Sequence, residues 1–237
     1  MTEQRAGSLT SGSLLLMIIA FAGIFLYGLL AALPGSVLPT LERNQYLPDD
    51  STVGTFLLIN AIGAVLAYAI SGPIIDRIGK KFALFLGTGL VAVSMVGFAL
   101  TVTKVQAPSA LVLIFGCSLV LGLGANAIVA AGHALVADVA SAWRNSALNL
   151  LDICFGLGLA SLPLVVQSLQ KRGGLGLIFW VLGIAAIFLF LVVVSAKFPG
   201  PSHAESANFS EAGSLFRNPS FLLLALALFI YVGAEVS

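Results

Sequence analysis

The chain has 237 residues, of which 59% are hydrophobic and only 9% are charged, and its formal net charge at pH 7 is +1. A soluble domain carries about 25% charged residues, so this composition excludes one and predicts a polytopic membrane protein. A near-neutral net charge without a basic patch also argues against a nucleic-acid partner.

Six stretches reach the length that a helix needs to cross the hydrocarbon core of a bilayer, about 20 apolar residues. In chain order they are 14–37, 53–75, 82–103, 110–131, 146–167 and 175–196. They predict an all-α, six-helix transmembrane bundle over 14–196, preceded by a short N-terminal segment, 1–13. A polar stretch at 197–220 predicts a central linker, and an apolar run at 221–237 predicts the start of a seventh helix.

The basic residues predict how the chain is oriented. Positively charged residues favour the cytoplasmic side of a membrane, and the two sides of the predicted bundle carry unequal numbers of them. Seven fall on the side of the N-terminus, against four on the other: Arg5, Arg77, Lys80, Lys81, Arg144, Lys197 and Arg217, against Arg43, Lys104, Lys171 and Arg172. The N-terminus and the linker are therefore expected in the cytoplasm, and the chain in the cell inner (plasma) membrane as a multi-pass protein embedded in the lipid bilayer.

A charged, glycine-bearing turn joins the second and third predicted helices. It reads Gly72-Pro-Ile-Ile-Asp76-Arg77-Ile-Gly79-Lys80-Lys81. This spacing resembles the signature loop of the major facilitator superfamily, Gly-x-x-x-Asp-Arg-x-Gly-Arg/Lys-Lys. The alternative is a basic anchor that only sets topology.

The resemblance implies a fold and a gate. The six helices would be the N-terminal half of a transporter, built from two inverted three-helix repeats (3+3), with the C-terminal half missing beyond helix 7 and the substrate near the midplane between the halves. The turn would form a cytoplasmic gating motif that holds the inner gate shut. Gly72 would permit close helix contact and Gly79 the tight turn. The residues of this motif are Gly72, Asp76, Arg77, Gly79, Lys80 and Lys81, with Asp138 and Arg144 on the loop across from them.

Polar side chains within the predicted spans point to a wet cavity. A buried Asp costs about 2.5–3.5 kcal/mol at a helix centre, so such residues should face a cavity or a partner. They follow helical spacing on the first, second, fourth and fifth helices and are almost absent from the third and sixth. The candidates for substrate or proton binding are Tyr27, Asn60, Asn126, His133, Asn149 and Asp152, with Glu235 in the seventh helix.

Simpler roles remain open for several of these candidates. Asn60 and Asn149 could serve as interhelical hydrogen bonds, each worth about 0.6 kcal/mol. Tyr27 could be a packing residue, and His133 an ordinary histidine near the membrane surface. Asp152 lies about two turns inside its helix, and His133 on the neighbouring helix is its candidate partner, at similar depth. Such a pair could pass a proton or latch the inner mouth.

Two further segments resemble the fucose permease-like, sugar:proton symporter branch of the same superfamily. One runs from Gly122-Leu-Gly-Ala-Asn126 to Phe155-Gly-Leu-Gly158, and the other is Tyr231-Val-Gly-Ala-Glu235. The branch implies sugar transport and proton coupling.

The leading hypothesis is a secondary transporter that moves a small polar solute, a monosaccharide first, by alternating access with coupling to protons, sodium being the alternative ion. The rivals are an exporter of amphipathic or drug-like compounds and a non-transporting membrane sensor or scaffold. An enzyme is not expected, because the sequence has no Ser/His pair, no HExxH motif and no paired membrane aspartates. No cofactor or metal is expected.

Overall fold

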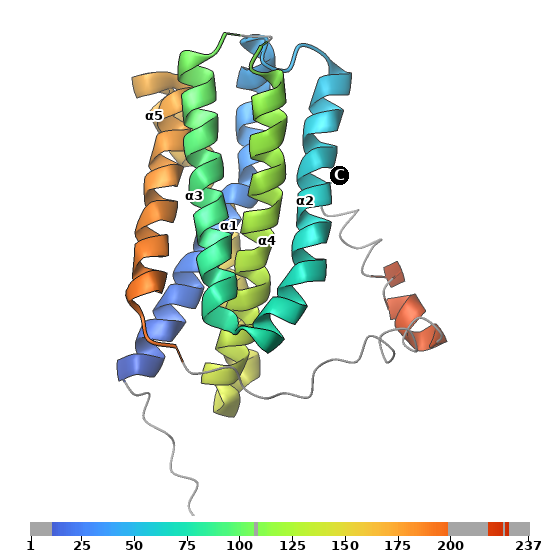
Figure 1. Ribbon diagram of the computed structural model, residues 1–237, viewed down its shortest axis with the longest axis vertical. Coiled ribbons are helices and arrows are strands. Elements are labelled where there is room, and N and C mark those ends of the chain that lie inside the picture. The colour runs from blue at the N-terminus through green and yellow to red at the C-terminus, as the bar shows by residue number, and fades with distance from the viewer. Residues whose placement is uncertain (1–10, 107–108, 199–217, 225, 228–237) are drawn as a thin grey trace, which may run out of the picture. The chain divides into compact units, whose positions relative to one another are not determined.

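The computed structural model describes residues 11–106, 109–198, 218–224 and 226–227. Within these ranges the chain is helical and contains no strand. Its elements are α1 (Ser11–Arg43), α2 (Asp50–Arg77), α3 (Lys80–Lys104), α4 (Leu111–Val139), the short 3-10 helix η1 (Ser141–Trp143) and α5 (Arg144–Ser195), which pack as one bundle (Figure 1).

The helix α5 contains two membrane spans. Its 52 residues would extend about 78 Å, more than twice the thickness of a hydrocarbon core. The backbone breaks at Gly174, whose φ of 68° and ψ of −165° are not helical. Gly174 thus divides α5 into a first segment (144–173) and a second segment (175–195), and the second runs back along the bundle (Figure 1). The six predicted spans are therefore all present.

Several helices are longer than their apolar stretches predicted. The helix α1 covers Ser11–Arg43 rather than 14–37, and α4 extends to Val139 rather than ending at residue 131. Polar residues at the ends of a span can continue a helix because the backbone hydrogen bonds do not depend on hydropathy. His133 and Asp138 consequently lie on α4 itself.

Paired glycines lie at close helix crossings of the described bundle. One such pair, Gly87 and Gly124, joins α3 to α4, and two other crossings are closer still. At the crossing of α1 with the first segment of α5, a Cβ on Gly28 would overlap the carbonyl oxygen of Phe155, and one on Gly158 would overlap that of Phe25. At the crossing of α2 with α4, a Cβ on Gly63 would overlap the carbonyl oxygen of Leu119, and one on Gly122 would overlap that of Asn60. Small residues let helix backbones approach closely in a membrane, where no hydrophobic driving force draws helices together.

The positions of the glycines show that the first three helices correspond to the last three. Gly79, which has a φ of 111°, follows Gly63 by 16 residues, and Gly174 follows Gly158 by the same 16. Each positive-φ glycine joins the second and third helices of its triplet. Moreover, the crossing of α1 with the first segment of α5, at Gly28 and Gly158, corresponds to the crossing of α4 with α2, at Gly122 and Gly63. In each case the first helix of one triplet crosses the second helix of the other. This correspondence is the one expected of the inverted 3+3 repeat.

Two helix faces are left open by the described residues. In the most apolar stretch of α2, 17% of the residues are buried, whereas in that of α3 the share is 56%. The exposed apolar side chains of α2 include Leu58, Ile62 and Val65, and the first segment of α5 exposes Ile153 and Leu157.

The segment after the bundle forms a separate unit, residues 203–237. In it, residues 219–224 and 226–227 are helical, so this helix begins two residues before the predicted start of the seventh helix at residue 221. Most of the predicted linker, and Glu235, lie outside the described residues.

Candidate functional site

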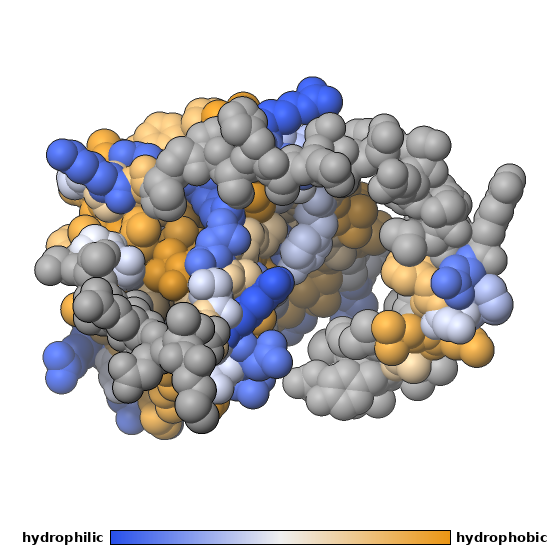
Figure 2. Space-filling model, turned by 90° about the horizontal axis from the view of Figure 1, so that it is seen from below, coloured by the Kyte–Doolittle hydropathy of each residue, from blue (hydrophilic) through white to orange (hydrophobic). Residues whose placement is uncertain are grey.

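The charged turn lies at one end of the bundle, beside the ends of two other helices. The helix α2 ends at Arg77 and α3 begins at Lys80, and the ends of α4 and of the second segment of α5 lie beside them (Figure 1). Gly79 makes the turn with a φ of 111°, a backbone conformation that other residues rarely adopt, so the expected tight turn is present. Figure 2 looks onto this end and shows hydrophilic residues gathered between apolar helix sides.

The two lysines of the turn bind different helices. Lys80 Nζ donates a hydrogen bond to Asp138 Oδ2 on α4, and the side chains of this ion pair are 15% and 49% exposed. Lys81 Nζ donates to the carbonyl oxygens of Val194, at 2.9 Å, and Ala196, at 2.7 Å. The turn therefore joins α3 to α4 and to the end of α5.

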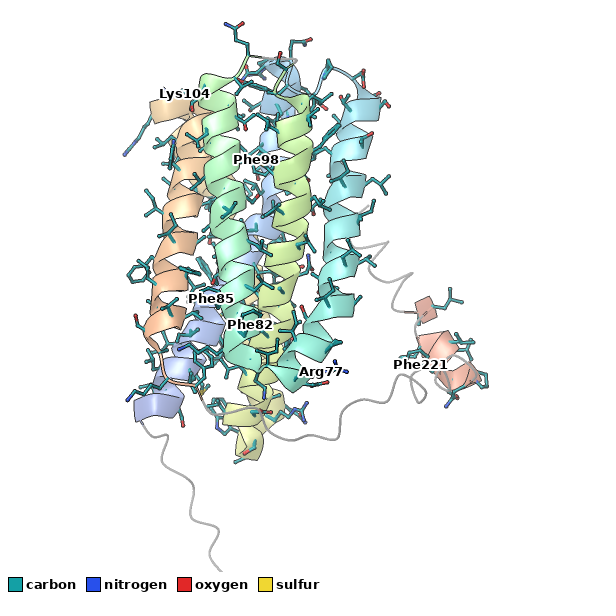
Figure 3. The ribbon with its side chains drawn as sticks, viewed as in Figure 1. Arg77, Phe82, Phe85, Phe98, Lys104 and Phe221 are labelled. Carbon is teal, nitrogen blue, oxygen red and sulfur yellow. The ribbon has the colours of Figure 1, made fainter. Side chains whose placement is uncertain are left out.

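Other residues of the predicted gating motif make fewer contacts. Asp76, Arg77 and Arg144 are exposed, and within the described ranges none of them forms an ion pair. Figure 3 shows Arg77 at the end of α2. Gly72 differs from the expectation of a close helix contact, because a Cβ there would meet no described atom within 4 Å. The close contacts of α2 occur at Gly63 instead.

A titratable pair joins α4 to the first segment of α5. His133 Nε2 lies 3.4 Å from Asp152 Oδ1, and the side chains are 39% and 65% exposed. The other ring nitrogen, Nδ1, lies 3.0 Å from the carbonyl oxygen of Val129, which orients the imidazole. Asp152 is eight residues into α5 and His133 six residues from the end of α4, so both lie about 9–12 Å from their helix ends.

The remaining candidates have separate surroundings. The Asn60 side-chain amide on α2 donates a hydrogen bond to the carbonyl oxygen of Ser118 on α4 at 3.0 Å. The Ser118 hydroxyl donates to the carbonyl oxygen of Phe56 on α2 at 3.1 Å, so these residues join α2 to α4. Asn126 is buried and donates to the carbonyl oxygen of Gly122 on its own helix.

The ring of Tyr27 stacks on Phe155 with centroids 5.4 Å apart. Asn149 is exposed, three residues before Asp152 on α5. The structure thus brings His133 and Asp152 together and does not bring the other candidates to them by any hydrogen bond among the described residues.

A polar pocket that sequence reasoning missed lies beyond the crossing of α1 with α5. It has a volume of about 490 Å³, and its polar lining residues are Ser36, Gln167 and Gln170. Gln170 Nε2 donates to Thr40 Oγ1 at 2.5 Å across this pocket's outer end. The available signal was the spacing of three between two amides, Gln167 and Gln170, at the end of the fifth predicted span.

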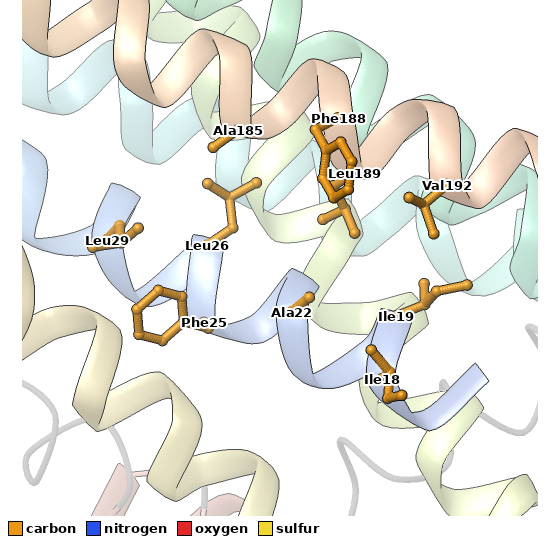
Figure 4. Close-up of a pocket in the computed structure, with 10 residues that line it drawn as sticks. All are labelled: Ile18, Ile19, Ala22, Phe25, Leu26, Leu29, Ala185, Phe188, Leu189 and Val192. Carbon is orange, nitrogen blue, oxygen red and sulfur yellow. The ribbon is translucent and has the colours of Figure 1, made fainter. Parts of the chain in front are cut away.

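A second cavity lies between α1 and the second segment of α5 and is apolar throughout (Figure 4). Its volume is about 380 Å³, and its lining residues include the two aromatic side chains Phe25 and Phe188. Among the described residues no group of three or more His, Cys, Asp or Glu side chains could hold a metal ion.

An all-helical bundle of apolar spans with a charged turn at one end defines a polytopic helical membrane protein. The sequence model of the Major Facilitator Superfamily matches residues 20–236. The chain belongs to this superfamily, whose members are transporters and not enzymes, and it is a multi-pass membrane protein.

Two curated relatives match most of the chain. It is 24% identical over 229 residues to "Bypass of stop codon protein 6" of Saccharomyces cerevisiae, a match of 86% of this chain and 44% of the relative. It is 25% identical over 196 residues to "Uncharacterized MFS-type transporter YfkL" of Bacillus subtilis, with coverages of 82% and 47%. The chain thus spans about half the length of these relatives.

A solved structure shares the fold. The chain superposes on a D-xylose-proton symporter with a TM-score of 0.71 and 16% sequence identity, covering 96% of this chain and 54% of that one. The likeness supports the fold of a major facilitator half, with six helices and the start of a seventh.

Proposed function

We propose that the protein is a secondary active transporter that moves a small polar solute, a monosaccharide first, by alternating access with proton coupling. The observation that carries the proposal is the contact of His133 with Asp152. Imidazole and carboxylate side chains are the groups that commonly bind and release protons in transport proteins. Both side chains are accessible, with 39% of His133 and 65% of Asp152 exposed among the described residues. Glu235, outside the described residues, is a further coupling candidate, and sodium is the alternative ion.

The polar pocket beyond the α1–α5 crossing suits the proposed solute. Its two amides and its hydroxyl, from Gln167, Gln170 and Ser36, offer both donors and acceptors to the hydroxyl groups of a sugar. It lies on the opposite side of the Gly28–Gly158 crossing from the His133–Asp152 pair. In this proposal solute and proton would bind at separate places, between α1 and the first segment of α5 for the solute and between α4 and that same segment for the proton.

The charged turn would act at the inner gate. Lys80 and Lys81 are bound within the bundle, which leaves Asp76 and Arg77 exposed at the end of α2. We assign this end to the cytoplasm, in the inner (plasma) membrane, because it holds most of the basic residues. The relatives are about twice as long as this chain, which leaves room for a second six-helix half. That half would cover the open faces of α2 and α5 and would contact Asp76 and Arg77.

An exporter of amphipathic compounds is the second candidate. The observation that favours it is the apolar cavity between α1 and α5, which would accept an apolar body (Figure 4). This cavity contains no polar lining residue, so it would give a sugar no hydrogen bond.

Uptake by the complete protein in proteoliposomes separates the two candidates. With an inward proton gradient, labelled D-xylose should accumulate, and a protonophore should abolish the accumulation. Uptake that ignores the proton gradient would contradict the coupling. Efflux of an amphipathic dye, without any sugar uptake, would favour the exporter instead.

A further inference from the structure

A groove on the outside of the bundle lies between the first turn of α3 and the last turn of α5. Its volume is about 430 Å³, and its lining residues are Ile78, Lys81, Phe82, Phe85 and Val194. Four of the five are apolar, and the fifth is a cation. The four apolar side chains are all more than a third exposed, so the groove is open to whatever surrounds these two helices.

The ammonium group of Lys81 has a fixed position in this groove. It donates to the carbonyl oxygens of Val194 and Ala196, and it lies 5.8 Å from the centroid of the Phe198 ring. The last carbonyl groups of a helix lack partners within the helix and carry partial negative charge, so they attract a cation. A lysine near the end of a span usually extends its amine toward water, whereas this one is held against the helix end.

Among the described residues, no carboxylate compensates the charge of Lys81. Lys80, one residue earlier, is neutralised by the carboxylate of Asp138. The described partners of Lys81 are two neutral carbonyl groups and a ring, and in that part of the chain no carboxylate contacts it. An ammonium group has three donors, so one N–H is left for a further acceptor.

The rest of the groove forms an apolar wall. Phe85 packs on Phe190 with ring centroids 4.9 Å apart, and Phe82 lies 6.1 Å from Phe85. These rings belong to α3 and the second segment of α5. Figure 3 shows Phe82 and Phe85 at the same end of the bundle as Arg77, and Lys104 at the other.

We propose that this groove binds an anionic phospholipid, with the headgroup phosphate on Lys81 and an acyl chain along Phe82, Phe85 and Val194. The pairing of one uncompensated cation with an apolar wall at the end of two membrane helices matches the charge and the shape of such a lipid. Basic pockets between helices at the membrane surface bind anionic headgroups for this reason. The lipid would hold α3 against the end of α5, independently of the solute.

Native mass spectrometry of the complete protein tests the proposal. The purified protein is incubated with equal amounts of phosphatidylglycerol and phosphatidylethanolamine of the same acyl chains, and the ratio of the two bound lipids is measured. Lys81→Gln keeps donors for the two carbonyl groups but removes the charge, so the ratio should fall about fivefold. Lys81→Arg should keep the ratio, and so should Lys104→Gln, the matched control at the other end of α3.

A second variant tests the apolar part of the groove and leaves the cation in place. Val194→Trp would fill the groove from its exposed side, and bound phosphatidylglycerol should fall although Lys81 remains. The proposal is overturned if Lys81→Gln and Val194→Trp both leave the ratio unchanged, or if Lys104→Gln lowers it equally. Displacement of the lipid by millimolar inorganic phosphate would also overturn it, because it would identify a site for the free anion.

Discussion

Lys80, in the first turn of α3, forms an ion pair with Asp138, in the last turn of α4. Each charge by itself stands at the unfavourable end of its helix. The N-terminus of a helix carries partial positive charge and repels a lysine, and the C-terminus carries partial negative charge and repels an aspartate. Because α3 and α4 are antiparallel neighbours, the two unfavourable charges meet and neutralise each other.

Exchanging the two charges should therefore be tolerated. In the double variant Lys80→Asp with Asp138→Lys, the pair is kept and each charge now suits its helix end, which is worth about 0.3–1 kcal/mol per end. We expect a thermal midpoint at or above that of the wild-type protein. Lys80→Asp alone places two carboxylates together and should lower the midpoint. A double variant that is less stable than both single variants would show that the pair does not act through charge.

The crossing of α2 with α4 predicts a sharp difference between two glycines of one helix. A Cβ on Gly122 would overlap the carbonyl oxygen of Asn60, whereas a Cβ on Gly116 would meet no described atom within 4 Å. Gly122→Ala should cost about 1–3 kcal/mol through overpacking. Gly116→Ala should be neutral or stabilise by up to about 1 kcal/mol, because Ala is the better helix former.

The measurement is the fraction of folded protein after heating, followed by size-exclusion chromatography in detergent. Equal losses for the two variants would mean that the helices can separate at the crossing and that the glycines are not needed for close contact.

Much of this fold could be predicted from the residue pattern, because length and hydropathy determine which segments cross a membrane. The charged turn at Gly79 was also predictable, since its glycine, acid and bases occur at fixed spacing. What hydropathy could not give was the extent of the helices. The last turns of α4, which carry His133 and Asp138, continue the helix beyond residue 131, where the apolar stretch was predicted to end, because backbone hydrogen bonds do not depend on hydropathy.

The candidate site was predictable in part. The helical spacing of His133 on one helix and Asp152 on the next indicated a common depth, and the structure places them 3.4 Å apart. Side-chain partners within the bundle were not predictable in the same way. Whether Asn60 faces a cavity or bonds to Ser118 depends on the rotation of α2 against α4, and the close packing at Gly63 sets that rotation.

Gly79 and Gly174 should be equally intolerant of a side chain. Their φ angles of 111° and 68°, with ψ near ±160°, belong to a region that is essentially restricted to glycine. Alanine at either position should cost about 1–3 kcal/mol. Gly72→Ala is the matched control, because Gly72 is helical and a Cβ there meets no described atom.

Thermal midpoints of the three variants, measured on the complete protein in detergent, check this prediction. If Gly72→Ala destabilises as much as Gly79→Ala, the effect arises from contacts outside the described residues rather than from the backbone conformation.

His133 and Asp152 should behave as one unit in transport, if the proposed proton coupling is correct. Asp152→Asn removes the carboxylate, and His133→Gln removes the titratable ring while it keeps an amide. Each should lower the response of labelled D-xylose uptake to a proton gradient by about fivefold or more. Because the side chains contact each other, the double variant should lose little beyond the worse single variant, whereas residues that act independently give additive losses.

Asp138→Asn, which breaks the separate pair with Lys80, supplies the comparison and should combine additively with Asp152→Asn. Additive losses for His133→Gln and Asp152→Asn would show that the 3.4 Å contact does not carry the coupling.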